Sequence, residues 1–271
     1  MSFLFRFTLA VAILLTSSFA GCVLSAQQME SRQTLRAVYG DFYPYSFKGP
    51  DGLAHGYSID IIRNLSQSTG YDVRFVAAKN PKQFLKMLER GDVDLTAFLA
   101  LTPERRAAGL ATASIGAYVL SAYVRQDSPK TKIEALSGKR IGVVVGAISQ
   151  SVAELLPEVE LVEYQTSDAL LLSLLRGEVD AVVSVSETFD ERLRASFVED
   201  KVRRLSPALA VTPYGIIVRR DLPEVHAAFE NAIKQTISPG TLRLLRSHWF
   251  GVDRSIVEHP WVRLKPWDQK E

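Results

Sequence analysis

Short β-rich runs alternate with amphipathic helices along most of this chain, and no other feature restricts its fold as strongly. From Leu35 onward, runs rich in β-branched and aromatic residues are followed by stretches whose apolar residues recur with the period of a helix. Strands that are separated by helices pair in parallel, because the connecting helix crosses over the sheet and covers one of its faces. The alternation therefore predicts an α/β fold.

The pattern arranges strands and helices in two successive sets. In the first set the predicted strands are 35–38, 71–76 and 94–99, and the predicted helices are 58–70 and 81–91. In the second set the predicted strands are 140–145, 160–164 and 180–184, and the predicted helices are 149–156 and 167–176. Ser58 is the expected N-cap of its helix, and Gly91 stands where a left-handed residue ends a helix.

One short sequence is repeated between the two sets. Residues 88–94 read LERGDVD and residues 174–180 read LLRGEVD, so a helix, a glycine and a strand meet in the same way in each set. An internal repeat of this kind indicates two units with one plan. We assign Asp94 and Asp180 to the starts of strands and give them no ligand role.

Two further strands connect the two sets. Residues 118–125 are predicted to leave the first set for the second, and residues 209–219 to return, followed by helices at 224–237 and 241–249. The chain then forms two α/β lobes with a hinge cleft, because such crossing strands can absorb the dihedral changes of domain closure. We expect lobe 1 to comprise residues 33–119 and 209–262, lobe 2 residues 124–205, and a tail residues 263–271.

The two ends of the chain differ from its body. Residues 1–26 are predicted to be a signal peptide, with Arg6 before an apolar run that is too short for the ~20 residues that span a membrane. At the other end, residues 255–271 are rich in proline and charge, and we expect an irregular tail that packs Trp261 or Trp267 on lobe 1. We assign this tail no function.

The chain has a single cysteine, Cys22. The preceding Phe19-Ala20-Gly21 resembles a lipobox, which would leave a lipid-anchored protein with Cys22 at its N-terminus, whereas cleavage after Ala20 or Ala26 would leave a protein without this anchor. Both alternatives export the mature protein from the cytoplasm. One cysteine cannot form an intramolecular disulfide, so the fold depends on its apolar core.

The composition argues against several classes of function. The 32 Lys and Arg residues nearly balance the 30 Asp and Glu residues, and no basic stripe interleaved with aromatic residues is present, so we expect no nucleic-acid partner. The sequence contains no metal-ligand spacing, phosphate-binding glycine loop, nucleophile elbow or paired His and Asp. We therefore expect no metal, no cofactor and no enzymatic activity.

Three stretches, in their order and spacing, resemble the motifs of one family. The first runs from Tyr43 to Asp60 and contains YPYSF, DG and GYSID; the second is LTPERR at 101–106; the third is LSGKRIGV at 136–143, with Gly146 beyond it. Together with WFG at 249–251, they make the chain resemble family 3 of the bacterial extracellular solute-binding proteins, the polar amino acid receptors of ABC importers. The resemblance implies a periplasmic protein whose two lobes close on an amino acid or related organic acid and present it to a membrane permease. We expect a monomer.

The resemblance gives Arg105 the central role. Arg105 follows the predicted strand 94–99, and open α/β sheets bind ligands at the carboxyl ends of their strands. A guanidinium can hold a carboxylate through two parallel hydrogen bonds, and the family's arginine at this motif position clamps the ligand carboxylate. We expect Thr102 to cap the short helix that begins at Pro103.

Lobe 2 is expected to contribute an anion site. Gly146, Ala147, Ile148 and Ser149 join a predicted strand to a predicted helix, so their backbone N–H groups would point into the cleft at the positive end of the helix dipole. This segment would face Arg105 across the closed cleft. Ser149 either caps the helix or contacts the ligand, and the sequence leaves both alternatives open.

Three further positions in lobe 1 are assigned through the resemblance. Phe42 matches the place where family members stack an aromatic ring on the ligand, and Tyr39 the place where many carry an acidic residue for the ligand amine. Ala100 stands five residues before Arg105, where amino acid binders commonly have threonine or serine. We include all three among the candidate ligand-binding residues, although Tyr39 and Ala100 depart from the family pattern.

The family's aspartate for the ligand ammonium is also missing from lobe 2. It would fall near Val185, between Ser184 and Glu187, which we include as candidate ligand-binding residues. Burying an ammonium without an anionic partner is costly. Unless Glu187 substitutes for the aspartate, a keto acid, a hydroxy acid, an aromatic acid or a modified amino acid would fit better than a standard α-amino acid.

Two other functions are compatible with the resemblance. Residues 212–223 are similar to the periplasmic modules of sensor kinases, so the ligand could be sensed, with the signal passing through a separate membrane partner. A few periplasmic dehydratases share the two lobes, and Glu187 would be the general base of such an enzyme, because a carboxylate in a dry cleft has a raised pKa. We expect binding rather than catalysis, and the sequence does not separate transport from sensing.

Overall fold

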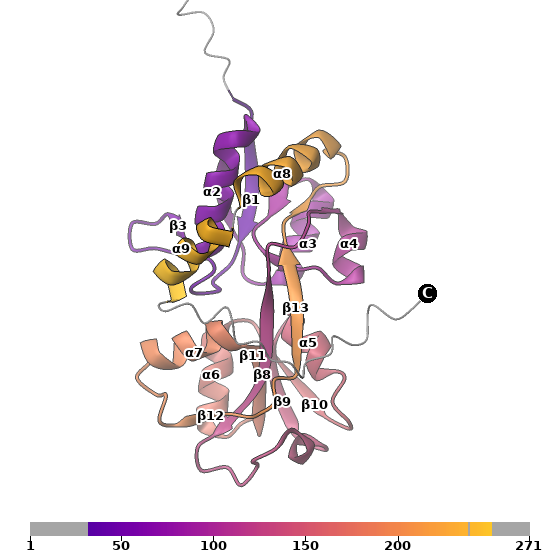
Figure 1. Cartoon of the computed structure of the whole chain (residues 1–271). Helices are drawn as coiled ribbons and strands as arrows, with labels where there is room; N and C mark the ends of the chain where they lie inside the picture. The colour runs from indigo at the N-terminus through magenta and orange to yellow at the C-terminus, as the bar shows by residue number, and fades with distance from the viewer. Residues whose placement is uncertain (1–31, 238, 251–271) are drawn as a thin grey trace, which may run out of the picture. The chain divides into compact units, whose positions relative to one another are not determined.

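The computed structural model describes residues 32–237 and 239–250 (Figure 1). Mixed helices and parallel strands confirm the predicted α/β class. Within the described residues, no helix is both long and apolar enough to cross a membrane. Several predictions lie outside the described residues: the signal peptide at 1–26 with Cys22, the end of lobe 1 at 251–262, and the tail at 263–271, together with Trp261 and Trp267.

Lobe 1 is built on a five-stranded sheet with the strand order β4-β1-β5-β14-β7. Its strands are β1 (Thr34–Tyr39), β4 (Asp72–Ala77), β5 (Leu95–Thr96), β7 (Leu110–Ala111) and β14 (Ile217–Val218). β1 pairs in parallel with β4 and β5, whereas β14 pairs antiparallel with β5 and β7. A small hairpin is formed by β2 (Phe47–Lys48) and β3 (Ala54–His55).

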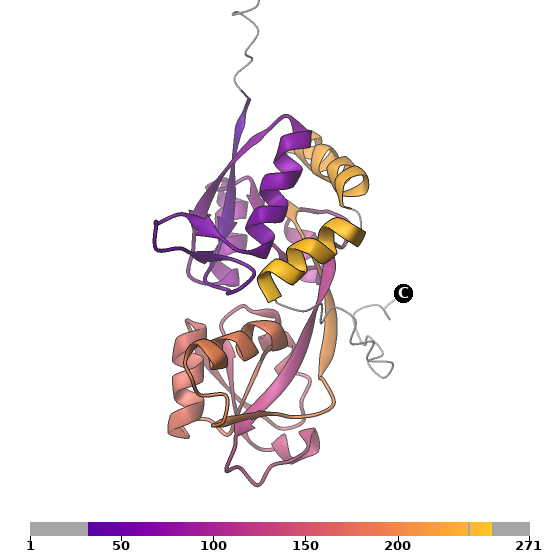
Figure 2. The same cartoon turned by 60° about the vertical axis from the view of Figure 1, so that its left-hand side comes forward.

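Helices from both ends of the chain cover lobe 1. They are α2 (Tyr57–Thr69), α3 (Pro81–Arg90), α4 (Pro103–Ala108), α8 (Pro223–Thr236) and α9 (Pro239–Phe250). α2 lies beside α8 and α9, so the last described helices pack on the first one (Figure 2). The chain therefore begins and ends its described part in the same lobe.

Lobe 2 is built on the second sheet, with the strand order β10-β9-β11-β8-β13-β6 and β12 paired to β8. The strands of this sheet, of which β6, β13 and the start of β8 fall within the predicted limits of lobe 1, are β6 (Leu99–Ala100), β8 (Gly116–Arg125), β9 (Arg140–Val144), β10 (Glu160–Tyr164), β11 (Ala181–Val185), β12 (Val202–Arg204) and β13 (Ala210–Gly215). β9 pairs in parallel with β10 and β11. The helices are α5 (Ile148–Ala153), α6 (Ser167–Arg176) and α7 (Ser186–Ala195), with a 3-10 turn at Ile133–Leu136.

β8 and β13 carry the chain from one lobe to the other and back (Figure 1). They are antiparallel neighbours, with Val119 opposite Val211. They correspond to the two predicted crossing strands. The predicted lobe limits remain a proposal. Residues 99–100 and 116–119, which those limits place in lobe 1, pair within the sheet of lobe 2.

Two predicted strands are each divided between the two sheets. The predicted strand 94–99 consists of β5 in the first sheet and the start of β6 in the second, and the predicted strand 209–219 consists of β13 and β14. Ala97, Phe98 and Ile216, which lie between the pieces, are buried as well, so the apolar pattern continues across each break. The apolar pattern of the sequence therefore indicates that these residues are buried, but it does not indicate which strand each segment pairs with.

Two details of the predicted helices were wrong, and one helix was not predicted. The N-cap of α2 is Gly56, and Ser58 lies inside the helix, where its hydroxyl donates to the carbonyl of Tyr45 at 2.7 Å. The predicted helix 149–156 begins at Ile148 and ends at Ala153. Helix α7 was not predicted, because its sequence SETFDERLRA is mostly polar and has a weak apolar stripe.

The predicted start of α3 at Pro81 and its end at Gly91 are confirmed, and the structure adds Asn80 as the N-cap. Asn80 caps the helix by accepting a hydrogen bond from the N–H of Gln83 at 3.1 Å, and Pro81 is its first residue. Gly91 follows in the left-handed conformation, with φ of 74°. Phe84 and Leu88 face the core from one side of this helix.

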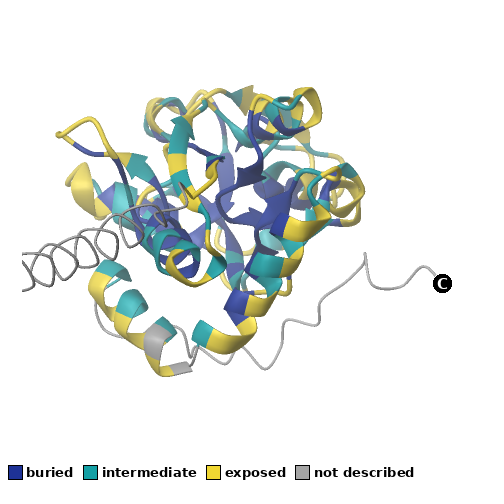
Figure 3. Cartoon of the chain, turned by 90° about the horizontal axis from the view of Figure 1, so that it is seen from above, coloured by how far each residue is buried: buried dark blue, intermediate teal, exposed yellow. Residues whose placement is uncertain are grey.

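The central strands are buried and the outer surfaces of the helices are exposed, as Figure 3 shows.

An aromatic cluster joins the segment after β1, the helix α2 and the two connecting strands. It comprises Tyr45, Tyr57, Tyr118 and Tyr214, whose ring centroids are 4.5 to 5.8 Å apart in the contacting pairs. Ring pairs at such distances add to the stabilisation from burial alone, so the cluster stabilises the junction between β8, β13 and lobe 1.

The repeated junction has the same geometry in both lobes. Gly91 and Gly177 end α3 and α6 at φ of 74° and 72°. Asp94 accepts a hydrogen bond from the backbone N–H of Arg36 in β1 at 2.8 Å, and Asp180 accepts the matching bond from the first residue of β9 at 3.1 Å. Each aspartate fixes the start of one strand against its neighbour, which is a structural role.

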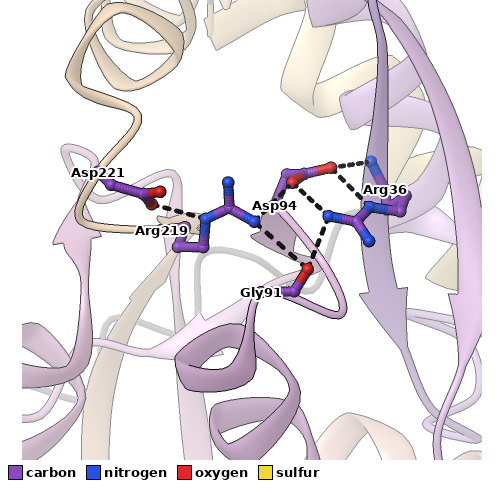
Figure 4. A network of polar contacts seen from close by, with 5 residues as sticks. All are labelled: Arg36, Gly91, Asp94, Arg219 and Asp221. Atoms are coloured by element: carbon purple, nitrogen blue, oxygen red, sulfur yellow. Dashed lines mark hydrogen bonds and ion pairs between the residues drawn. The ribbon is translucent and has the colours of Figure 1, made fainter.

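Asp94 also lies between two arginines (Figure 4). Its Oδ1 is 2.8 Å from Nη2 of Arg36 and 3.1 Å from Nη1 of Arg219, and 9% of its side-chain surface is exposed. Burial raises the pKa of Asp94, but the hydrogen bonds and charge of Arg36 outweigh burial and hold the pKa below its ordinary value of 3.8. The network ties β1 to the segments around β5 and β14.

We expect Asp94→Asn to lower the free energy of unfolding by about 2 kcal/mol at pH 7, because two arginines lose their anionic partner. Since the folded pKa is depressed, this contribution is present above the pKa of the unfolded chain and is lost as the pH falls through the folded pKa. Urea unfolding of wild type and variant should therefore give a smaller difference at pH 3 than at pH 7.

The control is Asp180→Asn, because the side chain of Asp180 is 34% exposed and its ion pair is with Lys130 alone. Its loss of stability should be smaller. If Asp94→Asn cost the same at pH 3 as at pH 7, the network would act through packing and not through charge.

Candidate functional site

A cavity of about 830 Å³, with its open mouth included, is lined by residues of both lobes. Its lining comprises residues 40–42, Ser46, 79–81, Phe84, 97–100 and Arg105 from lobe 1, Tyr118 from β8, and Val144, 147–149, 165–167, Ser184 and Val185 from lobe 2. Most of these residues lie at the carboxyl ends of β1, β4, β9, β10 and β11, where α/β sheets bind ligands.

Arg105 lies on α4 and points into this cavity. Thr102 caps the helix as predicted, accepting a hydrogen bond from the N–H of Arg105 at 3.3 Å. The Arg105 side chain donates from Nη1 to the carbonyl of Ala100 at 3.3 Å and from Nη2 to the carbonyl of Gly146 at 2.9 Å. The residue is 6% exposed, and burial lowers the pKa of its guanidinium.

Arg105 is a buried cation whose hydrogen-bond partners are neutral carbonyl groups. None of the ion pairs among the described residues involves Arg105. Burying a guanidinium in this way is unfavourable until an anion joins it. Because a carboxylate can occupy two of its N–H groups at once, the arrangement suits a carboxylate in the cavity.

The segment 146–149 meets Arg105, but not in the way that the sequence predicted. The carbonyl of Gly146, and not an N–H group, accepts from Arg105. The N–H of Gly146 donates to Oε1 of Gln150 at 2.8 Å, and the N–H of Ala147 donates to the carbonyl of Val144 at 3.0 Å. Two of the N–H groups that were expected to be free are therefore already paired.

The same segment contributes three residues to the cavity wall: Ala147, Ile148 and Ser149. Ala147 is the N-cap residue of α5, so Ser149 does not cap this helix. Ser149 is buried in the first turn and lines the cavity. Of its two predicted roles, contact with the ligand is the one that this position allows.

Phe42 and Ala100 also line the cavity. The Phe42 ring stacks on Tyr45 with centroids 5.4 Å apart and meets Tyr118 edge-on at 5.6 Å. Ala100 lies in β6, next to the Arg105 side chain. With Phe84 and Phe98, these residues give lobe 1 a largely apolar wall.

Tyr39 lies outside the cavity lining. It is the last residue of β1, it is buried, and its ring packs edge-on against Phe75 of β4 at 6.3 Å. Side chains alternate between the two faces of a strand, and Tyr39 packs in the same core cluster as Leu35 and Ala37. Its predicted contact with the ligand amine is therefore not part of the site.

Glu187 lies outside the cavity lining as well. Helix α7 begins directly after β11, so the chain turns and carries Glu187 toward Arg246 of α9, 3.5 Å away. Burial raises the pKa of Glu187, with its own backbone N–H and Arg246 opposing the rise. Ser184 and Val185 remain at the strand end and line the cavity, so no carboxylate stands where the family's aspartate was expected.

Several lining residues were missed from the sequence. Two short segments account for them: Lys79 and Asn80 lie between β4 and α3, and Gln165, Thr166 and Ser167 run from the end of β10 to the first residue of α6. Asn80 and Thr166 are the N-caps of these helices, so an N-cap signal after a predicted strand would have located them. Tyr118, whose hydroxyl donates to the carbonyl of Phe98 at 3.2 Å, had no signal besides its place on a crossing strand.

Polar contacts between the lobes surround the cavity. Nδ2 of Asn80 donates to Oε1 of Gln165 at 3.1 Å, and Arg192 of α7 lies 3.4 Å from a carboxylate oxygen of Asp41. Arg192 also pairs with Asp168 in its own lobe. With the bond from Arg105 to the Gly146 carbonyl, these contacts join the two lobes on different sides of the cavity.

Comparisons with known proteins agree with this arrangement. The family described as bacterial extracellular solute-binding proteins, family 3, matches residues 36–252. The L-cystine-binding protein TcyJ of Escherichia coli strain K12 is 25% identical over 258 residues, which cover 90% of this chain and 92% of that protein. By its name, that protein binds L-cystine.

Two solved structures have the same fold. An ancestral arginine-binding protein bound to arginine superposes with a TM-score of 0.73 at 23% identity, covering 81% of this chain and 99% of that one. A histidine kinase sensor domain similar to periplasmic binding proteins superposes with a TM-score of 0.71 at 22% identity, covering 82% and 99%. The two-lobed fold and the family match agree, and the chain belongs to the bacterial extracellular solute-binding proteins of family 3.

Proposed function

We propose that the protein binds a small carboxylate-bearing ligand between its lobes and presents it to a membrane transporter. The observation that carries the proposal is Arg105, a buried guanidinium at the cavity that has no anionic partner among the described residues. A ligand carboxylate would supply that partner. The relatives' names support the same class, since cystine and arginine both carry a carboxylate.

The lobes would close on the ligand and open to release it. Arg105 of lobe 1 and Ser149 and Ser184 of lobe 2 line the same cavity, so a ligand held there contacts both lobes and stabilises the closed form. A permease that recognises the closed form would then receive the ligand. We further propose a monomer in the periplasm, exported through residues 1–26, with lipid attachment at Cys22 as the alternative to a free mature protein.

The test is a screen of melting temperature against amino acids, keto acids, dicarboxylates and aromatic acids, after unfolding and refolding the protein to remove bound ligand. A ligand at ~100 times its dissociation constant should add about 2.7 kcal/mol to the free energy of unfolding. A clear rise with one class of carboxylate supports the proposal. A protein that responds to no carboxylate contradicts it.

Sensing is the second candidate function, and the likeness of residues 212–223 to sensor-kinase modules favours it. This segment forms the end of β13, all of β14 and the turn before α8, so it connects the two sheets. Transport and sensing begin with the same binding event. Permease and ATPase genes beside this gene would support import, and a lone regulator gene would support sensing.

We propose no catalytic activity. The dehydratase interpretation depends on Glu187 as a general base, and a base must lie within hydrogen-bond reach of the substrate. Glu187 lies outside the cavity lining and pairs with Arg246. Purified protein incubated with carboxylic acids that bear a hydroxyl group should therefore form no dehydrated product above the uncatalysed rate.

A further inference from the structure

We propose that the ligand is a carboxylate with an apolar body and no ammonium group, such as an α-keto acid with a branched or aromatic side chain. This inference rests on the proposed function, since it takes for granted that a carboxylate binds Arg105. It goes further in stating what the rest of the ligand must and must not carry. The charges, the carbonyl groups and the walls of the cavity each support it.

The one buried charge in the cavity lining is the cation of Arg105. Lys79 and Asp41, the other charged residues of the lining, are both exposed. The Asp41 side chain is 58% exposed and lies 3.4 Å from Arg192 of lobe 2. The lining carboxylate is thus at the solvent edge and already has a cationic partner, so it is poorly placed to neutralise a buried ammonium.

The inner part of the cavity has no negative group for an ammonium. Ser184 and Val185 end β11 on the lobe 2 side. Glu187, the nearest carboxylate in sequence, pairs with Arg246 outside the cavity. An ammonium placed beside Ser184 would lose its water without gaining an anion, which is strongly unfavourable.

Backbone carbonyl groups do not replace the missing carboxylate. Two carbonyl oxygens beside Arg105, those of Ala100 and Gly146, already accept hydrogen bonds from its guanidinium. The carbonyl of Phe98 accepts from the hydroxyl of Tyr118. These carbonyl oxygens are neutral and each already accepts a donor of the protein, so a ligand ammonium could only share them and would gain no negative charge there.

The walls suit an apolar ligand body. Phe42, Phe84 and Phe98 line the cavity from lobe 1, and Ile148 and Val185 line it from lobe 2. Burying apolar ligand surface against such walls is favourable and needs no hydrogen bonds. The guanidinium would hold one end of the ligand, and these side chains would enclose the other.

Matched pairs of ligands test the inference, because they differ only at the α-carbon. We would measure the binding of 4-methyl-2-oxopentanoate against L-leucine and of phenylpyruvate against L-phenylalanine by isothermal titration calorimetry on the refolded, ligand-free protein. We expect the keto acid of at least one pair to bind about tenfold more tightly or better than its amino acid. Equal or tighter binding of the amino acids would overturn the inference.

A change at Ser184 tests the physical cause. Ser184→Asp places a carboxylate on the cavity wall, so it should weaken the keto acid and strengthen the amino acid of the same pair. Ser184→Asn is the matched control, because asparagine has nearly the same size without the charge, and it should keep the preference for the keto acid. An unchanged preference in Ser184→Asp would contradict the proposed cause.

The possible failures of the two proposals can be told apart. Binding of amino acids or dicarboxylates, but of neither keto acid, would refute the present inference and leave the proposed function standing. The proposed function itself would fail if no carboxylate of any class raised the melting temperature of the wild type, so that the wild type and Arg105→Ala both gave unshifted melts. Binding of a keto acid that Arg105→Ala weakens supports both proposals.

Discussion

Arg105→Ala is expected to weaken ligand binding by about a hundredfold or more, the loss of about 3 kcal/mol that follows when a buried charge-assisted pair loses one partner. The guanidinium is buried, and its hydrogen bonds within the protein go to the carbonyl groups of Ala100 and Gly146. A ligand carboxylate would be its anionic partner. Titration calorimetry with the best carboxylate from the melting screen measures the loss.

The same substitution should change the stability of the ligand-free protein much less than its affinity. Alanine removes two hydrogen bonds, but it also removes a buried charge that lacks an anion, and these effects oppose each other within about 1 kcal/mol. Loss of binding with an unchanged ligand-free melt would thus separate a binding role from a folding role.

Two variants sharpen the test of Arg105. Arg105→Lys keeps the charge but loses the planar fork, so it should retain only part of the affinity. Arg106→Ala changes the neighbouring arginine of α4, which is exposed and donates to the carbonyl of Leu101, and it should bind as the wild type does. A wild-type affinity in Arg105→Ala would remove Arg105 from the site.

Gly146→Ala is expected to lower ligand affinity about tenfold or more by obstructing the approach of the lobes. A Cβ atom at Gly146 would lie 2.7 Å from the backbone nitrogen and 3.0 Å from the Cα of Lys82, in α3 of the other lobe. Backbone atoms cannot rotate away as a side chain can, so the lobes would have to move apart. The carbonyl of Gly146 would then leave Arg105, which it contacts at 2.9 Å.

Gly138→Ala is the matched control for this effect. Gly138 and Gly146 lie in the same lobe and have nearly the same left-handed backbone, with φ of 68° and 69°, so alanine causes similar local strain at both. A Cβ at Gly138, however, would meet no atom within 4 Å. Both variants should lose similar stability in urea, and Gly146→Ala alone should lose affinity. Equal affinity in the two variants would rule out lobe obstruction.

The sequence predicted the local elements of both lobes well. The strand at 160–164 and the helix at 167–176 have the bounds that were predicted, and the start of α3 at Pro81 and its end at Gly91 are confirmed. These features are decided by neighbouring residues, through apolar period, capping and the left-handed glycine. They therefore depend little on the rest of the fold.

The division of strands between the two sheets could not be predicted in the same way. The breaks between β5 and β6 and between β13 and β14 fall within runs that are buried throughout. Pairing is a contact between distant segments, such as Tyr214 with Ala100, and the apolar period is the same whichever sheet a strand joins.

The candidate site was predicted only in part, again because contacts between distant segments decide which side chains line it. The motif around Arg105 located the cation, and the segment after β9 was placed opposite it. Tyr39 and Glu187 were assigned by their place in the motif, but the direction of a strand face and the start of α7 turn both of them away from the cavity.

By itself, the sequence determined the α/β class, the two-part plan with its repeated junction and the family resemblance, and it predicted Arg105 as the residue that binds the ligand carboxylate. Tertiary structure alone decided that Arg105 donates to the Gly146 carbonyl, that Glu187 pairs with Arg246 and lies outside the cavity lining, and that Ser184 and Val185 line the cavity. The reason is physical: elements form from local periodicity, whereas charge pairing and cavity walls depend on which distant side chains the fold brings together.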